Sequence, residues 1–141
     1  MKRLAFIILF SMVFTSCELI VIGTKTDTTL TEVIEYNQKS ALGTIYLFKA
    51  ELDSNNVPAA SNMLKKPDGN TYLAIERYER FYDIHRFRRM ISSREITDIS
   101  SVVLSPDRMR YNLEFDFRRK LYFTASKIEN TWFITEMGNH E

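Results

Sequence analysis

Cysteine, glycine, proline and histidine are all scarce in this 141-residue chain. The single cysteine, Cys17, has no second cysteine with which to form a disulfide inside the chain. Four glycines and three prolines do not supply a glycine-rich phosphate loop or a dinucleotide-binding fingerprint. The only histidines, His85 and His140, lie far apart, and no His-Glu-x-x-His or cysteine pair accompanies them. We therefore expect no metal site and no cofactor.

The chain also lacks a strong net charge and a long apolar run. Its formal charge of +1 gives no electrostatic reason to expect nucleic-acid binding. Hydrophobic residues make up 45% and charged residues 26% of the chain, which is typical of a folded domain rather than a disordered one. The length suits one domain.

The first 16 residues have the pattern of a signal peptide. Lys2 and Arg3 precede an apolar segment, residues 4–14, which is too short for the roughly 20 residues that span a bilayer. The following residues, Phe14-Thr15-Ser16-Cys17, resemble a bacterial lipobox, with Phe14 where that family usually has leucine. The resemblance implies cleavage between Ser16 and Cys17 and acylation of Cys17. The mature chain would then carry a charge of −1, because Lys2 and Arg3 leave with the signal peptide.

Two alternatives to a lipid anchor are open. In ordinary secretion Cys17 would be incidental, and residues 4–22 could instead form an uncleaved membrane helix. Glu18 argues against that helix, because a carboxylate is costly inside a bilayer. We expect a lipoprotein of the bacterial cell envelope, held on a membrane by acyl chains on Cys17, with residues 17–28 as its tether. No acidic run follows Glu18, which favours an anchor that faces the periplasm.

Three helices are expected in the first half of the mature chain. A capping box at residues 29–32 predicts that the first helix begins at Thr29 and continues to Leu52. Gly43 would weaken this helix or allow another backbone to approach closely. Residues 57–64 are predicted to form a short helix, residues 65–70 a turn, and residues 71–91 a third helix. One apolar face of the third helix combines Ala74, Tyr78, Phe81, Tyr82 and His85. An adjacent apolar face consists of Ile84, Phe87 and Ile91.

The second half alternates with the two-residue period of strands. Strands are expected at residues 94–104, with a bulge, and at 108–117, 120–128 and 131–137. A three-residue loop at 118–120 would place Phe115 opposite Phe123, and a turn at Glu129-Asn130 would place Lys127 opposite Trp132. The chain is therefore predicted to be α+β, with N-terminal helices packed on a curved four-stranded antiparallel meander sheet.

This order of elements resembles the nuclear transport factor two-like superfamily, also described as cystatin-like. The resemblance lies in residues 41–64, a long helix followed by a polar turn and an alanine-rich short helix. It also lies in residues 128–137, where Asn130-Thr131-Trp132-Phe133-Ile134 matches the last hairpin of the family. It implies that residues 29–141 form a cone of helices on a curved sheet. Residues 65–70 leave little room for the hairpin that often precedes the third helix in the family.

No catalytic motif is present, so we expect a non-enzymatic module that binds a protein partner or a small apolar ligand. The alternative is an acid–base enzyme. Glu136 is predicted to lie inside the cone near Tyr78 or His85, where burial would raise the pKa of its carboxyl group. Isomerases and polyketide cyclases that resemble this fold use such residues. A core filled by aromatic side chains would favour the binding module, and an open pocket around Glu136 would favour the enzyme.

The arginines of the third predicted helix are the remaining feature. Arg86, Arg88 and Arg89 lie close together and acidic residues interleave with the arginines upstream. At helical spacing they are typical of a solvated, paired face. A surface that meets anionic headgroups is the alternative.

Overall fold

The computed structural model describes residues 33–140. The predicted signal peptide, Cys17, the tether and the capping box at Thr29 lie outside the described residues. Within residues 33–140 no helix has the length and apolar character needed to cross a membrane.

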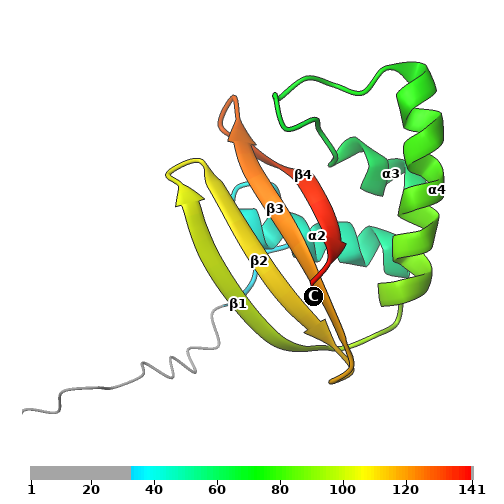
Figure 1. Ribbon diagram of the computed structural model, residues 1–141, viewed down its shortest axis with the longest axis vertical. Coiled ribbons are helices and arrows are strands. Elements are labelled where there is room, and N and C mark those ends of the chain that lie inside the picture. Colours follow the sequence, from blue (N-terminus) through cyan, green and yellow to red (C-terminus); the bar gives the residue numbers. More distant parts are fainter. Residues whose placement is uncertain (1–32, 141) are drawn as a thin grey trace, which may run out of the picture. The chain divides into compact units, whose positions relative to one another are not determined.

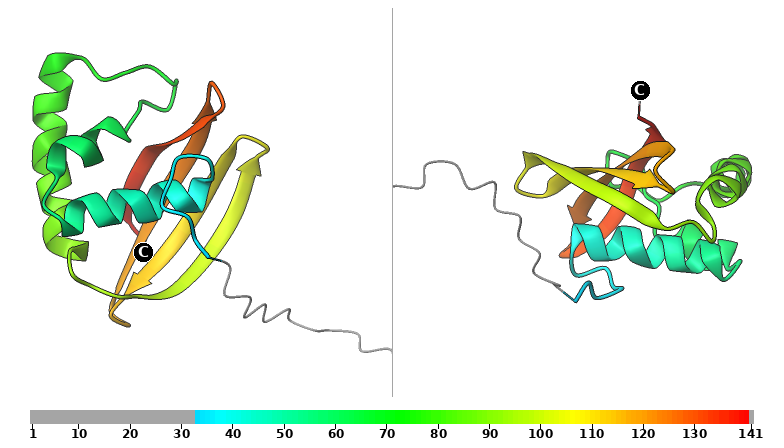
Figure 2. Two further views of the ribbon diagram at one scale, coloured as in Figure 1. Left: turned by 180° about the vertical axis from the view of Figure 1, so that it is seen from behind. Right: turned by 90° about the horizontal axis from the view of Figure 1, so that it is seen from below.

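The described chain has the predicted α+β architecture (Figure 1). Its helices are α2 (Ala41–Asp53), α3 (Val57–Asn62) and α4 (Ala74–Ile91). Its strands are β1 (Ile96–Ser105), β2 (Arg108–Phe115), β3 (Arg119–Ile128) and β4 (Thr131–Asn139), which form one antiparallel meander in the order β1-β2-β3-β4. Figure 2 shows that α2 crosses one face of the sheet, which we call the inner face, and that α4 stands beside the sheet. The opposite face, the outer face, carries no helix.

The first described helix begins later than predicted. Residues 33–40 form an irregular segment and a turn, and Ser40 caps α2 by accepting a hydrogen bond from the Gly43 amide at 3.0 Å. The turn binds the edge of β4 through Gln38. The Gln38 carbonyl accepts from the Trp132 amide at 2.9 Å, and the Gln38 side chain donates to the Trp132 carbonyl at 2.8 Å. These contacts with a distant strand outweigh the local helical pattern before Ser40.

Of the two roles considered for Gly43, the structure shows the close approach of another backbone. A Cβ atom at this position would lie 2.5 Å from the Glu35 carbonyl oxygen and 2.8 Å from the Asn37 carbonyl oxygen. The segment before α2 therefore packs directly against the backbone of α2 at Gly43, where no side chain intervenes.

Large apolar side chains fill the space between the helices and the inner face. Phe48 of α2 and Phe87 of α4 both contact Phe123 of β3, with ring centroids 6.3 Å apart in each pair. The core also includes Ile45, Leu52, Ile84, Ile91, Leu113, Phe115, Leu121, Trp132 and Ile134, all buried. This is a packed interior rather than an open cone.

The register between β2 and β3 differs from the predicted one by four residues, because Phe115 lies opposite Arg119 rather than Phe123 and the loop comes two residues earlier. Leu113 lies opposite Leu121, and the loop consists of residues 116–118. Asp116 determines this position, because its carboxylate accepts from the Arg94 guanidinium at 2.8 Å and from the Glu95 amide at 3.0 Å. A shift by an even number of residues keeps each side chain on its predicted face, but it leaves Phe117 in the loop, 79% exposed.

The register between β3 and β4 begins as predicted and then changes. Lys127 lies opposite Trp132 and Ala125 opposite Ile134, which confirms the two-residue turn at Glu129-Asn130. Both turn residues have positive φ, as this type of hairpin turn requires. A register shift follows, so that Thr124 lies opposite Glu136 and Thr135 is the extra residue of a β-bulge. The predicted inward position of Glu136 is wrong, because the bulge turns its side chain to the outer face.

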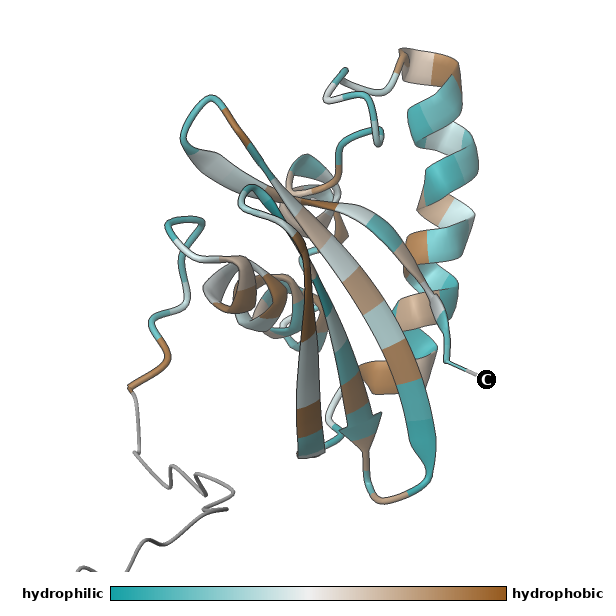
Figure 3. Cartoon of the chain, turned by 60° about the vertical axis from the view of Figure 1, so that its left-hand side comes forward, coloured by the Kyte–Doolittle hydropathy of each residue, from teal (hydrophilic) through white to brown (hydrophobic). Residues whose placement is uncertain are grey.

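Helix α4 buries a different face from the one that its aromatic residues suggest. Ile84, Phe87 and Ile91 are buried, whereas Tyr78 and Tyr82 are 68% and 67% exposed. Figure 3 shows hydrophobic and hydrophilic bands along the whole of α4. The neighbours of α4 supply the reason. Helices α2 and α3 pack against it and Phe87 contacts Phe123 of β3, and only the C-terminal half of α4 contributes buried residues to the core.

Candidate functional site

Two arginines hold Glu136 on the outer face. Arg108 of β2 donates to one carboxylate oxygen at 2.9 Å, and Arg110 donates to the other at 3.3 Å. The three side chains are 32–40% exposed, so water still reaches the cluster. The bulge at Thr135 creates this arrangement, since without it Glu136 would point to the inner face.

Arg110 is also fixed by β3. Its Nε donates to the Thr124 hydroxyl at 3.2 Å, and its guanidinium lies over the Tyr122 ring, 4.9 Å from the centroid. Thr124 is fully buried although it lies on the outer face, because Arg110 covers it. The guanidinium is therefore held in one place before any ligand arrives, which lowers the entropic cost of binding.

A shallow depression of about 480 Å³ lies next to this arginine on the outer face. Its lining combines apolar, aromatic and polar side chains, namely Val102, Leu104, Arg110, Asn112, Tyr122, Asn139 and His140. The two arginines and one carboxylate of the cluster leave one excess positive charge beside an apolar wall. Chemically, the depression suits a ligand that joins a carboxylate or phosphate to an apolar part.

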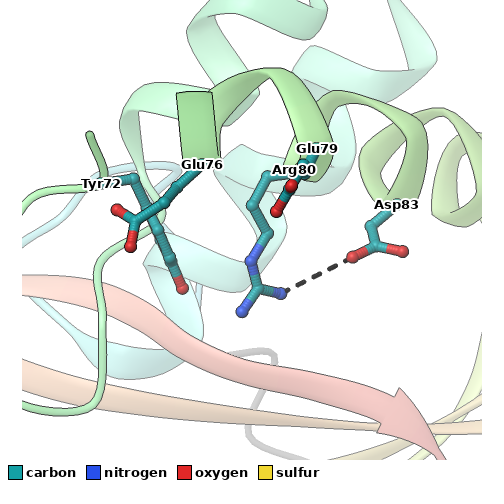
Figure 4. A pocket seen from close by; sticks show the side chains of 5 residues that line it. All are labelled: Tyr72, Glu76, Glu79, Arg80 and Asp83. Atoms are coloured by element: carbon teal, nitrogen blue, oxygen red, sulfur yellow. Dashed lines mark ion pairs between the residues drawn. The ribbon is translucent and has the colours of Figure 1, made fainter. Parts of the chain in front are cut away.

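A second depression, of about 380 Å³, lies along the first half of α4 and is lined by Tyr72, Glu76, Glu79, Arg80 and Asp83 (Figure 4). Arg80 pairs with Asp83 at 3.8 Å and lies over the Tyr72 ring, 5.0 Å from its centroid. These contacts join Arg80 to Asp83 and to Tyr72 along the first half of α4.

Glu76 binds Lys66 rather than Arg80, although Arg80 lies four residues later on the same helix, a spacing that allows an ion pair. The Lys66 ammonium lies 2.7 Å from Glu76, and the Leu73 amide donates to the same carboxylate at 2.7 Å. These two hydrogen bonds lower the pKa of Glu76, that from Lys66 having the larger effect. The same pair raises the pKa of Lys66. Glu76 therefore ties the turn at residues 65–70 to the first turn of α4.

The three residues predicted to form an acid–base site do not come together. Tyr78 pairs with Tyr82 on an exposed face of α4, with the hydroxyl oxygens 3.4 Å apart, and this hydrogen bond raises the pKa of Tyr82. His85 packs edge-on against Phe81, with centroids 4.7 Å apart. In the described part of the chain, no hydrogen bond joins Tyr78, His85 and Glu136.

The two-residue alternation along residues 108–117 puts Arg108 and Arg110 on the face opposite the apolar one, but it indicates no role for them. The signal that could have found them is the pair of arginines two residues apart on one strand, since both must lie on the same face. Their common partner could not be found this way, because the bulge at Thr135 leaves no mark in the sequence.

Among residues 33–140, no three histidine, cysteine, aspartate or glutamate side chains gather in a way that could hold a metal ion. Comparison with protein-family models, with curated proteins and with solved structures finds no match for this chain.

Proposed function

We propose that this protein is a lipid-anchored binding module of the bacterial cell envelope, facing the periplasm. The support for the anchor is the signal-peptide pattern that ends at the only cysteine, Cys17. Several acyl chains hold a protein firmly on a bilayer, because each buried methylene contributes about 0.8 kcal/mol.

The contrast between the two faces of the sheet is the observation that carries the binding role. Phe48, Phe123 and their neighbours fill the inner face, which leaves little room there for an apolar ligand. The outer face is open and presents a fixed arginine, Arg110, beside a depression of about 480 Å³. We infer that the outer face binds a carboxylate- or phosphate-bearing ligand, either free or displayed on a partner protein. An acid–base enzyme finds less support, since Glu136 is paired with two arginines outside the core.

We further propose that the fold is a reduced form of the nuclear transport factor two-like superfamily. The order of a long helix, a short alanine-containing helix, a third helix and a four-stranded meander supports this relationship. Residues 65–70 form a turn and contribute no strand, so the small hairpin that often precedes the third helix in that family is absent from the described chain.

The anchor is tested by the intact mass of protein extracted from membranes. We expect a chain that begins at Cys17 and carries the added mass of acyl groups. The Cys17→Ser variant should move to the soluble fraction or accumulate with its signal peptide uncleaved. A processed N-terminus with no acyl mass would overturn the anchor.

The binding role is tested by NMR titration of the protein with octanoate, using octanol as the uncharged probe. We expect octanoate to shift the Arg110 Nε–H and Tyr122 resonances, and octanol to have a much smaller effect. Arg110→Gln should abolish the response, whereas Arg119→Gln, at an exposed position of β3, should preserve it. Equal responses to the two probes, or shifts confined to other regions, would exclude an anion site on the outer face.

A further inference from the structure

Helix α4 presents an unusual surface on the side directed away from the core. The buried residues Ile84, Phe87 and Ile91 define the inward direction, and successive residues rotate by 100°. The residues that project within about 50° of the opposite direction are Ile75, Tyr78, Tyr82, Arg86 and Arg89. We call these five residues the outward face of α4. All five are exposed.

The composition of this face does not suit contact with water alone. A helix on a protein surface normally places charged and polar residues of both signs opposite its buried face. The outward face of α4 has an isoleucine, two tyrosines and two arginines, and it includes no carboxylate. The acidic residues of the helix lie beside it or turn towards other partners, as Glu76 does towards Lys66 and Asp83 towards Arg80.

The two tyrosines form one continuous aromatic surface. The rings of Tyr78 and Tyr82 pack edge to face with centroids 5.7 Å apart, and Ile75 lies one turn before Tyr78, 72% exposed. Tyrosine rings are enriched at the boundary between water and lipid, because one end is apolar and the other polar. Arginine completes such a surface, since its stem packs on apolar groups while its guanidinium reaches phosphate.

We propose that the outward face of α4 rests on the anionic surface of the membrane to which the protein is anchored. This inference depends on the lipid anchor proposed above. Fifteen residues lie between Cys17 and Val33. This segment spans at most about 55 Å when extended, so the tether is long enough for the domain to turn α4 towards the bilayer. Anchoring also raises the effective concentration of the surface, so a weak contact is sufficient.

The contact fixes how the rest of the domain is presented. Tyr78 and Tyr82 would lie among the headgroups, Arg86 and Arg89 would bind lipid phosphates, and Ile75 would enter the boundary of the acyl region. Because the outward face of α4 is directed away from the core, the outer face of the sheet would stay accessible to its ligand. The domain would thus be held in one orientation rather than swinging on its tether.

The test uses the lipidated protein in vesicles and measures oxidation of side chains by hydroxyl radicals. We expect oxidation of Tyr78 and Tyr82 to fall severalfold in vesicles that contain phosphatidylglycerol, compared with vesicles of phosphatidylcholine alone. Phe117 is the internal control, because it is 79% exposed on a loop between β2 and β3 and should react equally in both. Equal oxidation of the tyrosines in the two lipids, or equal protection of Phe117, would overturn the proposal.

Charge variants separate lipid recognition from simple crowding at the surface. Each arginine near an anionic surface contributes about a fivefold increase in affinity, so replacing Arg86 and Arg89 by glutamine should restore oxidation of Tyr78 and Tyr82 to the phosphatidylcholine level. The matched control replaces Arg118 and Arg119, both exposed, and should leave the protection unchanged.

Flotation of the vesicles distinguishes failure of this inference from failure of the anchor. Protein that does not float with the lipid refutes the anchor. Protein that floats but leaves Tyr78 and Tyr82 reactive refutes only the contact by α4. Protection that occurs in intact cells and not in pure lipid would show that the face binds a protein, and it would also overturn the proposal.

Discussion

Replacing Gly43 by alanine should destabilise the domain, although helix propensity alone predicts the opposite. Alanine is favoured over glycine inside a helix by about 1 kcal/mol. The added Cβ atom would lie 2.5 Å from the Glu35 carbonyl oxygen and 2.8 Å from that of Asn37. Both neighbours are backbone atoms, so the whole turn at residues 35–38 must move to accommodate the methyl group.

The size of the effect follows from the contacts that this movement would break. Gln38 makes two hydrogen bonds to Trp132, at 2.9 and 2.8 Å, and each contributes about 1 kcal/mol. Ser40 caps α2, and loss of a cap costs about 1 kcal/mol. After the gain in helix propensity is subtracted, the net loss is about 2 kcal/mol.

Urea unfolding monitored by circular dichroism gives the free energy of unfolding of the Gly43→Ala variant. Hydrogen exchange at the Trp132 amide gives a local readout, since this amide donates to Gln38. We expect faster exchange at Trp132 together with the lower stability. A variant more stable than the parent by about 1 kcal/mol, with unchanged exchange at Trp132, would refute the packing of the turn against α2.

Three further predictions concern stability. Phe48 is fully buried, so Phe48→Ala should lower the free energy of unfolding by about 3–5 kcal/mol in urea titrations, and a loss below 1 kcal/mol would contradict a filled core. Gly69 has a φ of +86°, and a Cβ atom there would lie at an ordinary contact distance of 3.8 Å from the Ile128 side chain. Gly69→Ala should therefore cost about 1 kcal/mol from backbone strain and not from a clash, and no loss would contradict the positive φ. The pKa of Glu76 is lowered in the folded state by Lys66, so its stabilising effect is present above its ordinary pKa of 4.5 and is lost as the pH falls below it. Melting temperatures of the parent and Glu76→Gln should therefore differ at pH 7 and converge near pH 3, and a difference independent of pH would refute the ion pair.

Local sequence signals predicted the class and order of the elements. The alternation of residues 108–115, the turn at Glu129-Asn130 and the helical period of residues 74–91 all depend on neighbours within a few positions. For that reason the meander, the register next to the last turn and the three helices follow from the sequence. The start of α2 does not, because its competitor is a hydrogen bond from Trp132 to Gln38, a pair almost a hundred residues apart.

The candidate site and the exposed surface of α4 depended on tertiary structure. A bulge of one residue at Thr135 moves Glu136 from the inner to the outer face, because side chains alternate with a period of two and a single insertion reverses every later position. Helix α4 has two apolar stripes, one with Tyr78 and Tyr82 and one with Ile84, Phe87 and Ile91. Helical spacing does not indicate which of the two is buried. Only contact with α2, α3 and the sheet selects Ile84, Phe87 and Ile91, and leaves Tyr78 and Tyr82 exposed. The sequence by itself thus determined which elements form, because their signals are local. The folded chain decided which faces they bury, because burial depends on partners that are distant in the sequence.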